Sequence, residues 1–167
     1  LAQGGVGAQA REGAAVGVDE GFEPRGAQVR RSEPMYDGAL EVLARLKQDG
    51  WLLAIATGKT HRGLDSLFAR HDIRSCFDTV WCADDGPGKP HPFMVEQSMR
   101  AVGCVPARSV MIGDAIHDIA MGRAAGVRSL GVTWGFGQAS ELDEAGADEV
   151  HHEFRTLTES LLAFAAR

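Results

Sequence analysis

The sequence predicts an α/β fold in which a mainly parallel sheet lies between two layers of helices. Two observations favour it. Short apolar runs of strand length alternate with segments whose apolar residues recur at helical spacing. Several of these runs are continuous, which is typical of strands covered on both faces. A chain of 167 residues with 44% hydrophobic residues can bury a core of this kind in one domain.

The alternation is regular from Pro34 onward. Asp37 can cap the first helix and Gly50 can end it, and Pro92 suits a first helical position. The predicted helices cover residues 38–48, 61–71, 92–102, 116–125 and 154–164. The predicted strands cover residues 51–56, 79–83, 109–112, 129–133 and 149–150. Strands and helices in this order build βαβ units and therefore a parallel sheet.

The first 33 residues have a different composition. Seven glycines and six alanines precede Arg31, so this segment has little apolar surface to bury. We therefore divide the chain into a Gly/Ala-rich segment, residues 1–33, expected to be disordered or the remnant of a second domain, and a core domain, residues 34–167. The strand-like stretch within the first segment is residues 14–19.

Charge and cysteine content exclude several classes of function. A net charge of −6 argues against nucleic acid or an anionic membrane as the main partner. We find no apolar run of membrane-spanning length and no signal-peptide pattern. The three cysteines, Cys76, Cys82 and Cys104, form no C-x-x-C pair, so we expect neither a disulfide framework nor a structural zinc site, and a reducing cytoplasm as the location.

The most informative stretch is 110–118. An apolar run ends at Gly113, Asp114 follows at the end of the predicted strand, and Asp118 falls in the first turn of the next helix. Ligands of open α/β sheets bind at this carboxyl end of the strands. Two carboxylates there suit a hard cation, and we predict a Mg2+ site formed by Asp114 and Asp118.

Two further strand ends carry polar residues. Thr57 follows the strand 51–56, and Lys89 lies in the loop after the strand 79–83. Right-handed crossovers place all these strand ends on one side of the sheet, so the residues can converge. A hydroxyl with neighbouring backbone N–H groups, a lysine and a carboxylate pair are most of what phosphoryl transfer requires.

Each of these residues also has an ordinary structural interpretation. Thr57 alone could be a strand-end cap, Lys89 a solvated loop lysine, and Asp114 and Asp118 helix-capping carboxylates. Their joint occurrence in this order favours the phosphate and metal interpretation. For other polar residues we expect structural or solvent-exposed positions: His91, His117, His151 and His152, and the pair Asp84–Asp85 in a solvated turn. The loop 134–137 is expected to pack beside the site.

With these motifs the chain resembles the haloacid dehalogenase (HAD) superfamily, and within it the phosphoglycolate-phosphatase-like branch. The second motif of that family matches residues 57–59 and the third matches residues 88–92. The fourth matches residues 113–118 and continues through residues 121–126. The resemblance runs from about Pro34 to the C-terminus, and the three motifs together are specific.

The resemblance implies a Rossmann-like three-layer core and a Mg2+ cofactor. It implies that Thr57 and Gly58 bind the phosphate and that Lys89 bridges phosphate and nucleophile. It further implies that Asp114 ligates Mg2+ and that Asp118 supports the metal or Lys89. Thr57, Lys89 and Asp118 are thus the candidate catalytic residues. The expected activity is Mg2+-dependent hydrolysis of small phosphorylated metabolites.

The chain departs from the family at its first motif. The family carries Asp-x-Asp-Gly-Thr on a central strand; its first Asp is the nucleophile and its second the general acid and base. No such segment occurs here, and most of the helical cap is also lacking. Asp19 has no second Asp at the required spacing, so we do not expect it to replace the nucleophile. We expect a sheet without its usual central first strand and a chain that is inactive alone.

These expectations leave two classes of function open. The first is a phosphatase that acts on small phosphorylated metabolites. The second is a non-catalytic domain that binds phosphate or Mg2+, or that associates with itself or with a partner supplying the central strand, because unpaired strand edges favour association.

Overall fold

The computed structural model describes residues 13–16 and 35–166. Six parallel strands form one sheet in the order β3-β2-β1-β4-β5-β6. The strands are β1 (Gly13–Val16), β2 (Trp51–Ala56), β3 (Thr79–Trp81), β4 (Ser109–Gly113), β5 (Arg128–Val132) and β6 (Glu149–His151). The predicted α/β class and parallel sheet are confirmed.

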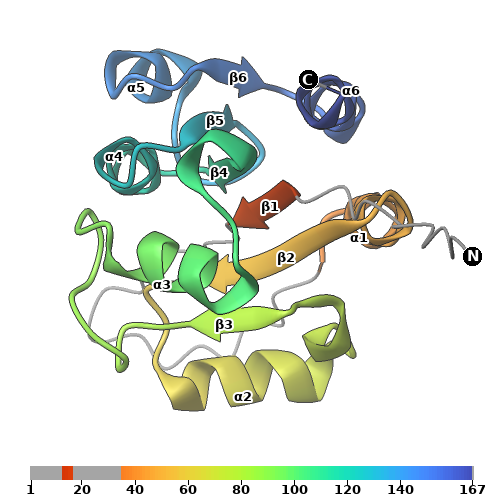
Figure 1. The fold of residues 1–167 in the computed structure, drawn as a ribbon, viewed down its shortest axis with the longest axis vertical. Coiled ribbons are helices and arrows are strands. Elements are labelled where there is room, and N and C mark those ends of the chain that lie inside the picture. The colour runs from red at the N-terminus through yellow and green to blue at the C-terminus, as the bar shows by residue number, and fades with distance from the viewer. Residues whose placement is uncertain (1–12, 17–34, 167) are drawn as a thin grey trace, which may run out of the picture.

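Helices cover both faces of this sheet (Figure 1). They are α1 (Ala39–Gln48), α2 (His61–Arg70), α3 (Phe93–Val102), α4 (Ile116–Ala124), α5 (Ala139–Glu144) and α6 (Phe154–Ala165), with short 3-10 turns at Arg74–Cys76 and Pro106–Arg108. Five helices lie where their apolar spacing predicts them. Helix α5 is not predicted by the sequence, because only Leu142 of its residues is buried and no apolar stripe marks it. Among the described helices, none is long and apolar enough to cross a membrane.

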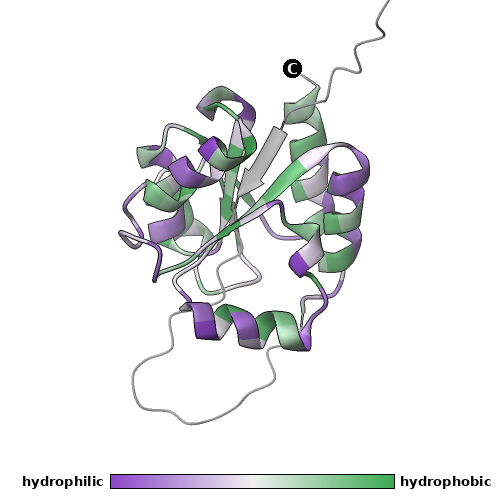
Figure 2. Cartoon of the chain, turned by 60° about the horizontal axis from the view of Figure 1, so that its bottom comes forward, coloured by the Kyte–Doolittle hydropathy of each residue, from purple (hydrophilic) through white to green (hydrophobic). Residues whose placement is uncertain are grey.

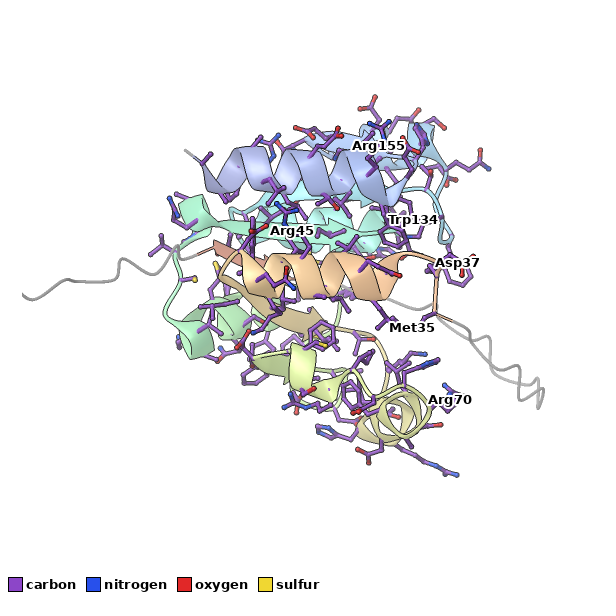
Figure 3. All side chains as sticks on the ribbon, turned by 90° about the vertical axis from the view of Figure 1, so that its right-hand side faces the viewer. Met35, Asp37, Arg45, Arg70, Trp134 and Arg155 are labelled. Atoms are coloured by element: carbon purple, nitrogen blue, oxygen red, sulfur yellow. The ribbon has the colours of Figure 1, made fainter. Side chains whose placement is uncertain are left out.

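The residues of β2 show how the strands divide the core in two. Leu53 and Ile55 face one cluster, to which α1, α2 and α6 contribute, whereas Ala54 and Ala56 face the other, to which α3 and α4 contribute. This alternation is the two-residue period of a strand buried on both faces. Figure 2 shows the apolar residues gathered inside and the hydrophilic ones on the outer helix surfaces. Helices α1 and α6 run side by side on the first face (Figure 3).

The centre of the sheet differs from expectation. We expected the usual central strand to be missing, but β1 takes that position and pairs with both β2 and β4. Val16 is in register with Ala54 on one side and Met111 on the other. The expectation of an open gap is therefore corrected: a backbone of four residues suffices to continue the hydrogen-bonded ladder. What the chain lacks is the Asp-x-Asp-Gly-Thr motif, not a strand at this place.

Because β1 belongs to the same sheet as β2–β6, these four residues are part of the core layer. Residues 17–34 and Asp19 within them lie outside the described residues, and so do residues 1–12. The expectation of disorder or a cap remnant for residues 1–33 falls largely on these residues. All strands point the same way, so the residues that follow β2, β3, β4 and β5 share one side of the sheet. The candidate functional residues follow these strand ends.

Candidate functional site

Thr57 comes directly after β2 and is buried, with 1% of its surface exposed. Its backbone N–H donates to the carbonyl of Trp81 at 3.0 Å, which ties this strand end to β3. Its Oγ1 accepts a hydrogen bond from the backbone N–H of Lys59 at 3.1 Å. The backbone therefore turns around the hydroxyl before α2 begins. A methyl group added at Gly58 would meet no atom within 4 Å, so the loop is open beside this residue.

Lys89 and Asp118 form a buried ion pair. Lys89 Nζ lies 2.5 Å from Asp118 Oδ1, and the two side chains are 8% and 0% exposed. The other carboxylate oxygen, Oδ2 of Asp118, accepts from the backbone N–H of Ala115 at 3.1 Å and so caps α4. Lys89 and Asp118 are 29 residues apart in sequence, and through this pair the predicted third and fourth motifs meet. Because both oxygens of Asp118 are engaged, its first role in this structure is to hold Lys89.

Asp114 follows β4 and is 6% exposed. Its Oδ2 accepts from the backbone N–H of Phe136 at 2.9 Å, and its carbonyl accepts from the N–H of Gly137 at 2.7 Å. The loop after β5 therefore wraps around Asp114. The prediction that the loop 134–137 packs beside the site is confirmed, but the hydrogen bonds of its backbone to Asp114 could not be predicted, because backbone donors leave no mark in a sequence.

Glycines allow these close approaches. A Cβ at Gly113 would collide with the side chain of Asp118, and one at Gly135 would collide with the carboxylate of Asp114. Both carboxylates are thus packed against backbone that has no side chain. The Asp118 side chain packs against the backbone of Gly113, the residue before Asp114. The Lys89–Asp118 ion pair is therefore next to Asp114 in the structure.

Thr57 and Asp114 line one cavity of about 150 Å³, together with Gly113 and Gly135. The rest of the cavity is apolar and lies between the sheet and the helices α1 and α6, with Leu43, Leu46, Leu157 and Leu161 among its lining residues. Met35 and Trp134, which also line it, lie near the same end of α1 (Figure 3). The carboxyl ends of β2 and β4 therefore open onto a shared space.

The donor types at this place determine which ligands it suits. Asp114 offers carboxylate oxygen, the ligand type that Mg2+ prefers. Lys89, the Thr57 hydroxyl and the backbone N–H of Gly58 offer the donors and the positive charge that a phosphate requires. The residues present thus fit Mg2+ at Asp114, while Asp118 fits better as the partner of Lys89 than as a second direct ligand.

Two expectations about other polar residues are corrected. His151 is buried, not solvated: its Nδ1 lies 3.2 Å from Thr156 Oγ1 and its Nε2 3.1 Å from Glu149 Oε2. Burial lowers the pKa of His151 despite the neighbouring Glu149. The pair Asp84–Asp85 is not a plain solvated turn, since each carboxylate accepts a backbone N–H, from His61 and Cys82 respectively.

Three further histidines, His91, His117 and His152, lie where the sequence predicts them. His91 and His152 are exposed, and His91 Nδ1 accepts from the backbone N–H of Phe93 at 3.2 Å, which is a structural role at the start of α3. His117 is also exposed. None of these three residues is assigned a role at the strand ends.

Comparison with known proteins gives consistent results. Residues 25–132 match the family model of haloacid dehalogenase-like hydrolases. The "Probable phosphatase IndB" of Dickeya dadantii is 38% identical over 112 residues, which are 66% of this chain and 49% of that protein. The phosphoglycolate phosphatase of Aliivibrio fischeri is 28% identical over 84% of this chain and 61% of its own length. The pyrophosphatase PpaX of Bacillus velezensis is 35% identical over 59% of this chain and 46% of its own length.

Solved structures show the same fold. A predicted phosphatase from Clostridium acetobutylicum superposes with a TM-score of 0.71 and 26% identity, covering 77% of this chain and 60% of that one. A HAD-superfamily hydrolase from Ehrlichia chaffeensis gives a TM-score of 0.69 at 23% identity, covering 83% and 62%. The chain spans about half to three fifths of the length of the curated relatives it matches.

Proposed function

The chain belongs to the haloacid dehalogenase-like hydrolase family. We propose that it carries part of the active site of a Mg2+-dependent phosphatase, namely the phosphate-binding residues, the lysine and the metal-binding carboxylate. The substrate class proposed is small phosphorylated metabolites, as for the phosphoglycolate phosphatases among its relatives. One observation carries the proposal: Thr57 and Asp114 line a single cavity, and the buried Lys89–Asp118 pair adjoins it through Gly113.

The roles follow from the geometry. The Thr57 hydroxyl and the backbone N–H of Gly58 bind a phosphoryl oxygen. Lys89 supplies positive charge, and Asp118 holds its ammonium group in place from the start of α4. Asp114 would hold Mg2+, oriented by the N–H of Phe136. When bound, Mg2+ neutralises phosphate charge and favours in-line attack.

The attacking group is the part that the family motif would supply and that this chain lacks. Without Asp-x-Asp-Gly-Thr the residues above can bind and polarise a phosphate ester but have no carboxylate in the family's position to attack it. We therefore propose that the 167-residue chain alone has negligible phosphatase turnover.

The first test measures turnover and binding separately. We expect no Mg2+-dependent hydrolysis of p-nitrophenyl phosphate above background. Robust hydrolysis that is lost in Asp19→Asn would overturn the proposed inactivity and make Asp19 the nucleophile. Asp19 is the residue to substitute because of its position after β1. Val16 is in register with Ala54 and Met111. Asp19 follows Val16 by three positions, just as Thr57 and Asp114 follow Ala54 and Met111.

The binding arm tests the site itself. In calorimetry with inorganic phosphate and Mg2+, we expect Asp114→Asn to weaken the dependence of phosphate binding on Mg2+, and Thr57→Ala to weaken phosphate binding. His117→Ala, an exposed residue of the same loop–helix segment, serves as the control and should change neither. Wild-type binding that both Asp114→Asn and Thr57→Ala leave intact would contradict the assigned site.

The missing motif favours one alternative, a non-catalytic domain that binds phosphate or Mg2+. The two proposals differ in what the parent gene encodes. An in-frame Asp-x-Asp-Gly-Thr segment upstream of the codon for Leu1 supports the phosphatase, and a natural product that starts near Leu1 supports the alternative. Because β1 continues the sheet, a partner that donates a central strand is no longer needed to explain the fold. Self-association stays a proposal.

The proposed location is the cytoplasm. No disulfide joins the three cysteines, of which Cys82 is buried and Cys76 and Cys104 are partly buried, and reduced thiols of this kind are typical of a reducing compartment.

A further inference from the structure

A second group of possible ligands lies at the carboxyl end of β3, beside the phosphate-binding loop but separate from its residues. His61 is the first residue of α2, and Cys82 and Asp84 follow β3. One potential ligand atom from each lies within 4.8 Å of the other two. The three residues come from two segments about 20 positions apart, so the fold brings them together, not the local sequence.

The contact between the thiol and the imidazole has the dimensions of a metal site. Cys82 Sγ lies 3.4 Å from His61 Nδ1. With Zn–S of about 2.3 Å and Zn–N of about 2.0–2.1 Å, two ligands of a tetrahedral zinc ion stand roughly 3.6 Å apart. The two atoms thus already lie near the separation that a shared zinc ion requires.

Asp85 fixes the orientation of the imidazole. His61 Nε2 lies 3.0 Å from Asp85 Oδ1, so the proton of the neutral ring is held on Nε2. The lone pair of the ring is then on Nδ1, the atom that faces Cys82 Sγ. A carboxylate on the far nitrogen of a ligating histidine is the usual outer partner in zinc sites. Asp85 also accepts from the backbone N–H of Cys82 at 2.8 Å, which fixes its position.

We propose that His61, Cys82 and Asp84 bind one thiophilic divalent ion, with Zn2+ as the natural candidate and with Asp85 as the outer partner of His61. Thiolate, imidazole and one carboxylate make a mixed donor set that suits zinc and does not suit Mg2+. The ion replaces the thiol proton, which leaves to solvent as the Zn–S bond forms. Three protein ligands leave a fourth position for water.

Access and electrostatics are consistent with this arrangement. The Cys82 thiol is buried, but the side chain of His61 is 62% exposed, so an ion reaches the site from the side of His61. Burial, together with Asp85 and Asp84, raises the pKa of the Cys82 thiol. The ion must therefore displace the thiol proton in order to bind.

The site adjoins the phosphate loop. The backbone N–H of Ala83 donates to the carbonyl of Lys59 at 3.0 Å, and His61 follows Lys59 by two positions. A bound ion would therefore join the start of α2 to the end of β3 across this hydrogen bond. The proposal concerns the ion alone and does not depend on the phosphatase assignment.

The test uses Co2+ as a spectroscopic probe of the 167-residue chain. We expect an equimolar Co2+ complex with a thiolate-to-metal charge-transfer band and tetrahedral ligand-field bands, both abolished by excess Zn2+ but not by excess Mg2+. His61→Gln should weaken binding at least tenfold, and Cys82→Ala should remove the charge-transfer band. Asp85→Asn should weaken binding by about 10- to 100-fold, the usual cost of losing an outer partner.

Matched variants separate this site from other thiols and from the Mg2+ site. Cys104→Ser should leave the band unchanged, and so should Asp114→Asn. Absence of the band in wild type, its persistence in Cys82→Ala, or wild-type affinity for Co2+ in His61→Gln would each overturn the proposal. His61→Gln keeps the buried thiol and changes an exposed side chain, so its result stands even if Cys82→Ala fails to fold.

Discussion

The ends of β4 and β3 lie on the same side of one sheet but are built in opposite ways. At the end of β4 the charged groups are buried: Asp118 is fully enclosed, Lys89 is paired with it, and Gly113 leaves room for the carboxylate. At the end of β3 the thiol is buried, but His61 projects toward solvent. The charged groups at the end of β4 are therefore part of the buried core, whereas the His61 side chain at the end of β3 lies on the surface.

This difference separates stability from chemistry. Removing one member of a buried charge pair leaves the other unpaired inside the protein, so a substitution at the β4 end affects folding as well as ligand binding. Contacts at an exposed side chain contribute little to folding. A substitution of His61 at the β3 end can therefore change ligand binding alone. Four variants test this distinction, from the largest expected effect to the smallest.

Lys89→Met should have the largest effect. It leaves the fully buried Asp118 without its cation, and we expect the free energy of unfolding to fall by about 3–5 kcal/mol in urea titrations at neutral pH. The double variant Lys89→Met/Asp118→Asn removes both charges and should recover much of this loss, because an amide oxygen can still accept from Ala115 N–H. Equal losses in the single and double variants would show that the ion pair does not set the stability of this end.

Gly113→Ala should cost less, about 1–3 kcal/mol, because the added methyl group overlaps the side chain of Asp118 and forces it to shift. Gly58→Ala is the matched control: the same methyl group meets no atom within 4 Å and should change stability by under about 1 kcal/mol. If the two variants unfold at the same urea concentration, the close packing at Gly113 is not what holds Asp118.

Asp78→Asn tests the opposite side of the sheet, before β3, where no ligand is proposed. Burial opposes ionisation of Asp78, but hydrogen bonds from Lys47 and from the backbone N–H of Leu53 outweigh it and lower the pKa of this carboxyl below its ordinary 3.8. We expect Asp78→Asn to lose about 1 kcal/mol at pH 7 and to leave phosphate and metal binding unchanged.

The pH dependence gives the Asp78 prediction a sign. A carboxyl whose pKa is lower in the folded state stabilises the protein fully above the pKa of the unfolded chain. That contribution is lost as the pH falls through the lower pKa of the folded state. The difference between wild type and Asp78→Asn should therefore be constant above about pH 5 and shrink below the ordinary pKa of 3.8. If the difference in free energy of unfolding between wild type and Asp78→Asn grew toward acid pH, the pKa of Asp78 would not be lowered in the folded state.

The two strand ends also differ in how far the sequence predicts them. At the β4 end, Gly113, Asp114 and Asp118 lie within six consecutive residues, and apolar periodicity places them at a strand end and a first helical turn. That Asp118 supports either the metal or Lys89 is what the family resemblance implies, and the structure shows the contact with Lys89. Strand order alone does not predict it, because β2 and β1 separate β3 from β4. That Asp114 binds the metal and Lys89 the phosphate stays a prediction.

At the β3 end the same reasoning fails. Cys82 belongs to no C-x-x-C pair, and His61 lies 21 residues before it, so no sequence motif links the two residues. Their contact depends on how β2 and β3 pair and where α2 starts. For a related reason the sequence marks residues 14–19 as strand-like but does not predict that a strand there occupies the centre of the sheet. Gly13–Val16 are small residues without an apolar stripe, and the neighbouring strands, rather than their own sequence, define the strand.

His61→Gln should have the smallest effect on folding. The His61 side chain is 62% exposed, and Gln keeps the backbone N–H that donates to Asp84. We expect the free energy of unfolding in EDTA to change by about 0.5 kcal/mol or less. Zinc should then distinguish the two proteins. At a free concentration 100 times its Kd, it should stabilise the wild type by about 2.7 kcal/mol, because it binds only the folded chain.

The same zinc concentration should stabilise His61→Gln far less, because the Nδ1 ligand is gone. Equal stabilisation of the two proteins would place the ion elsewhere. A loss above about 2 kcal/mol in EDTA would show that His61 supports the core after all, and the β3 end would then resemble the β4 end. Two results together would identify a metal-binding site that does not contribute to the stability of the core. His61→Gln leaves the free energy of unfolding unchanged without metal, and zinc stabilises the protein only when His61 is present.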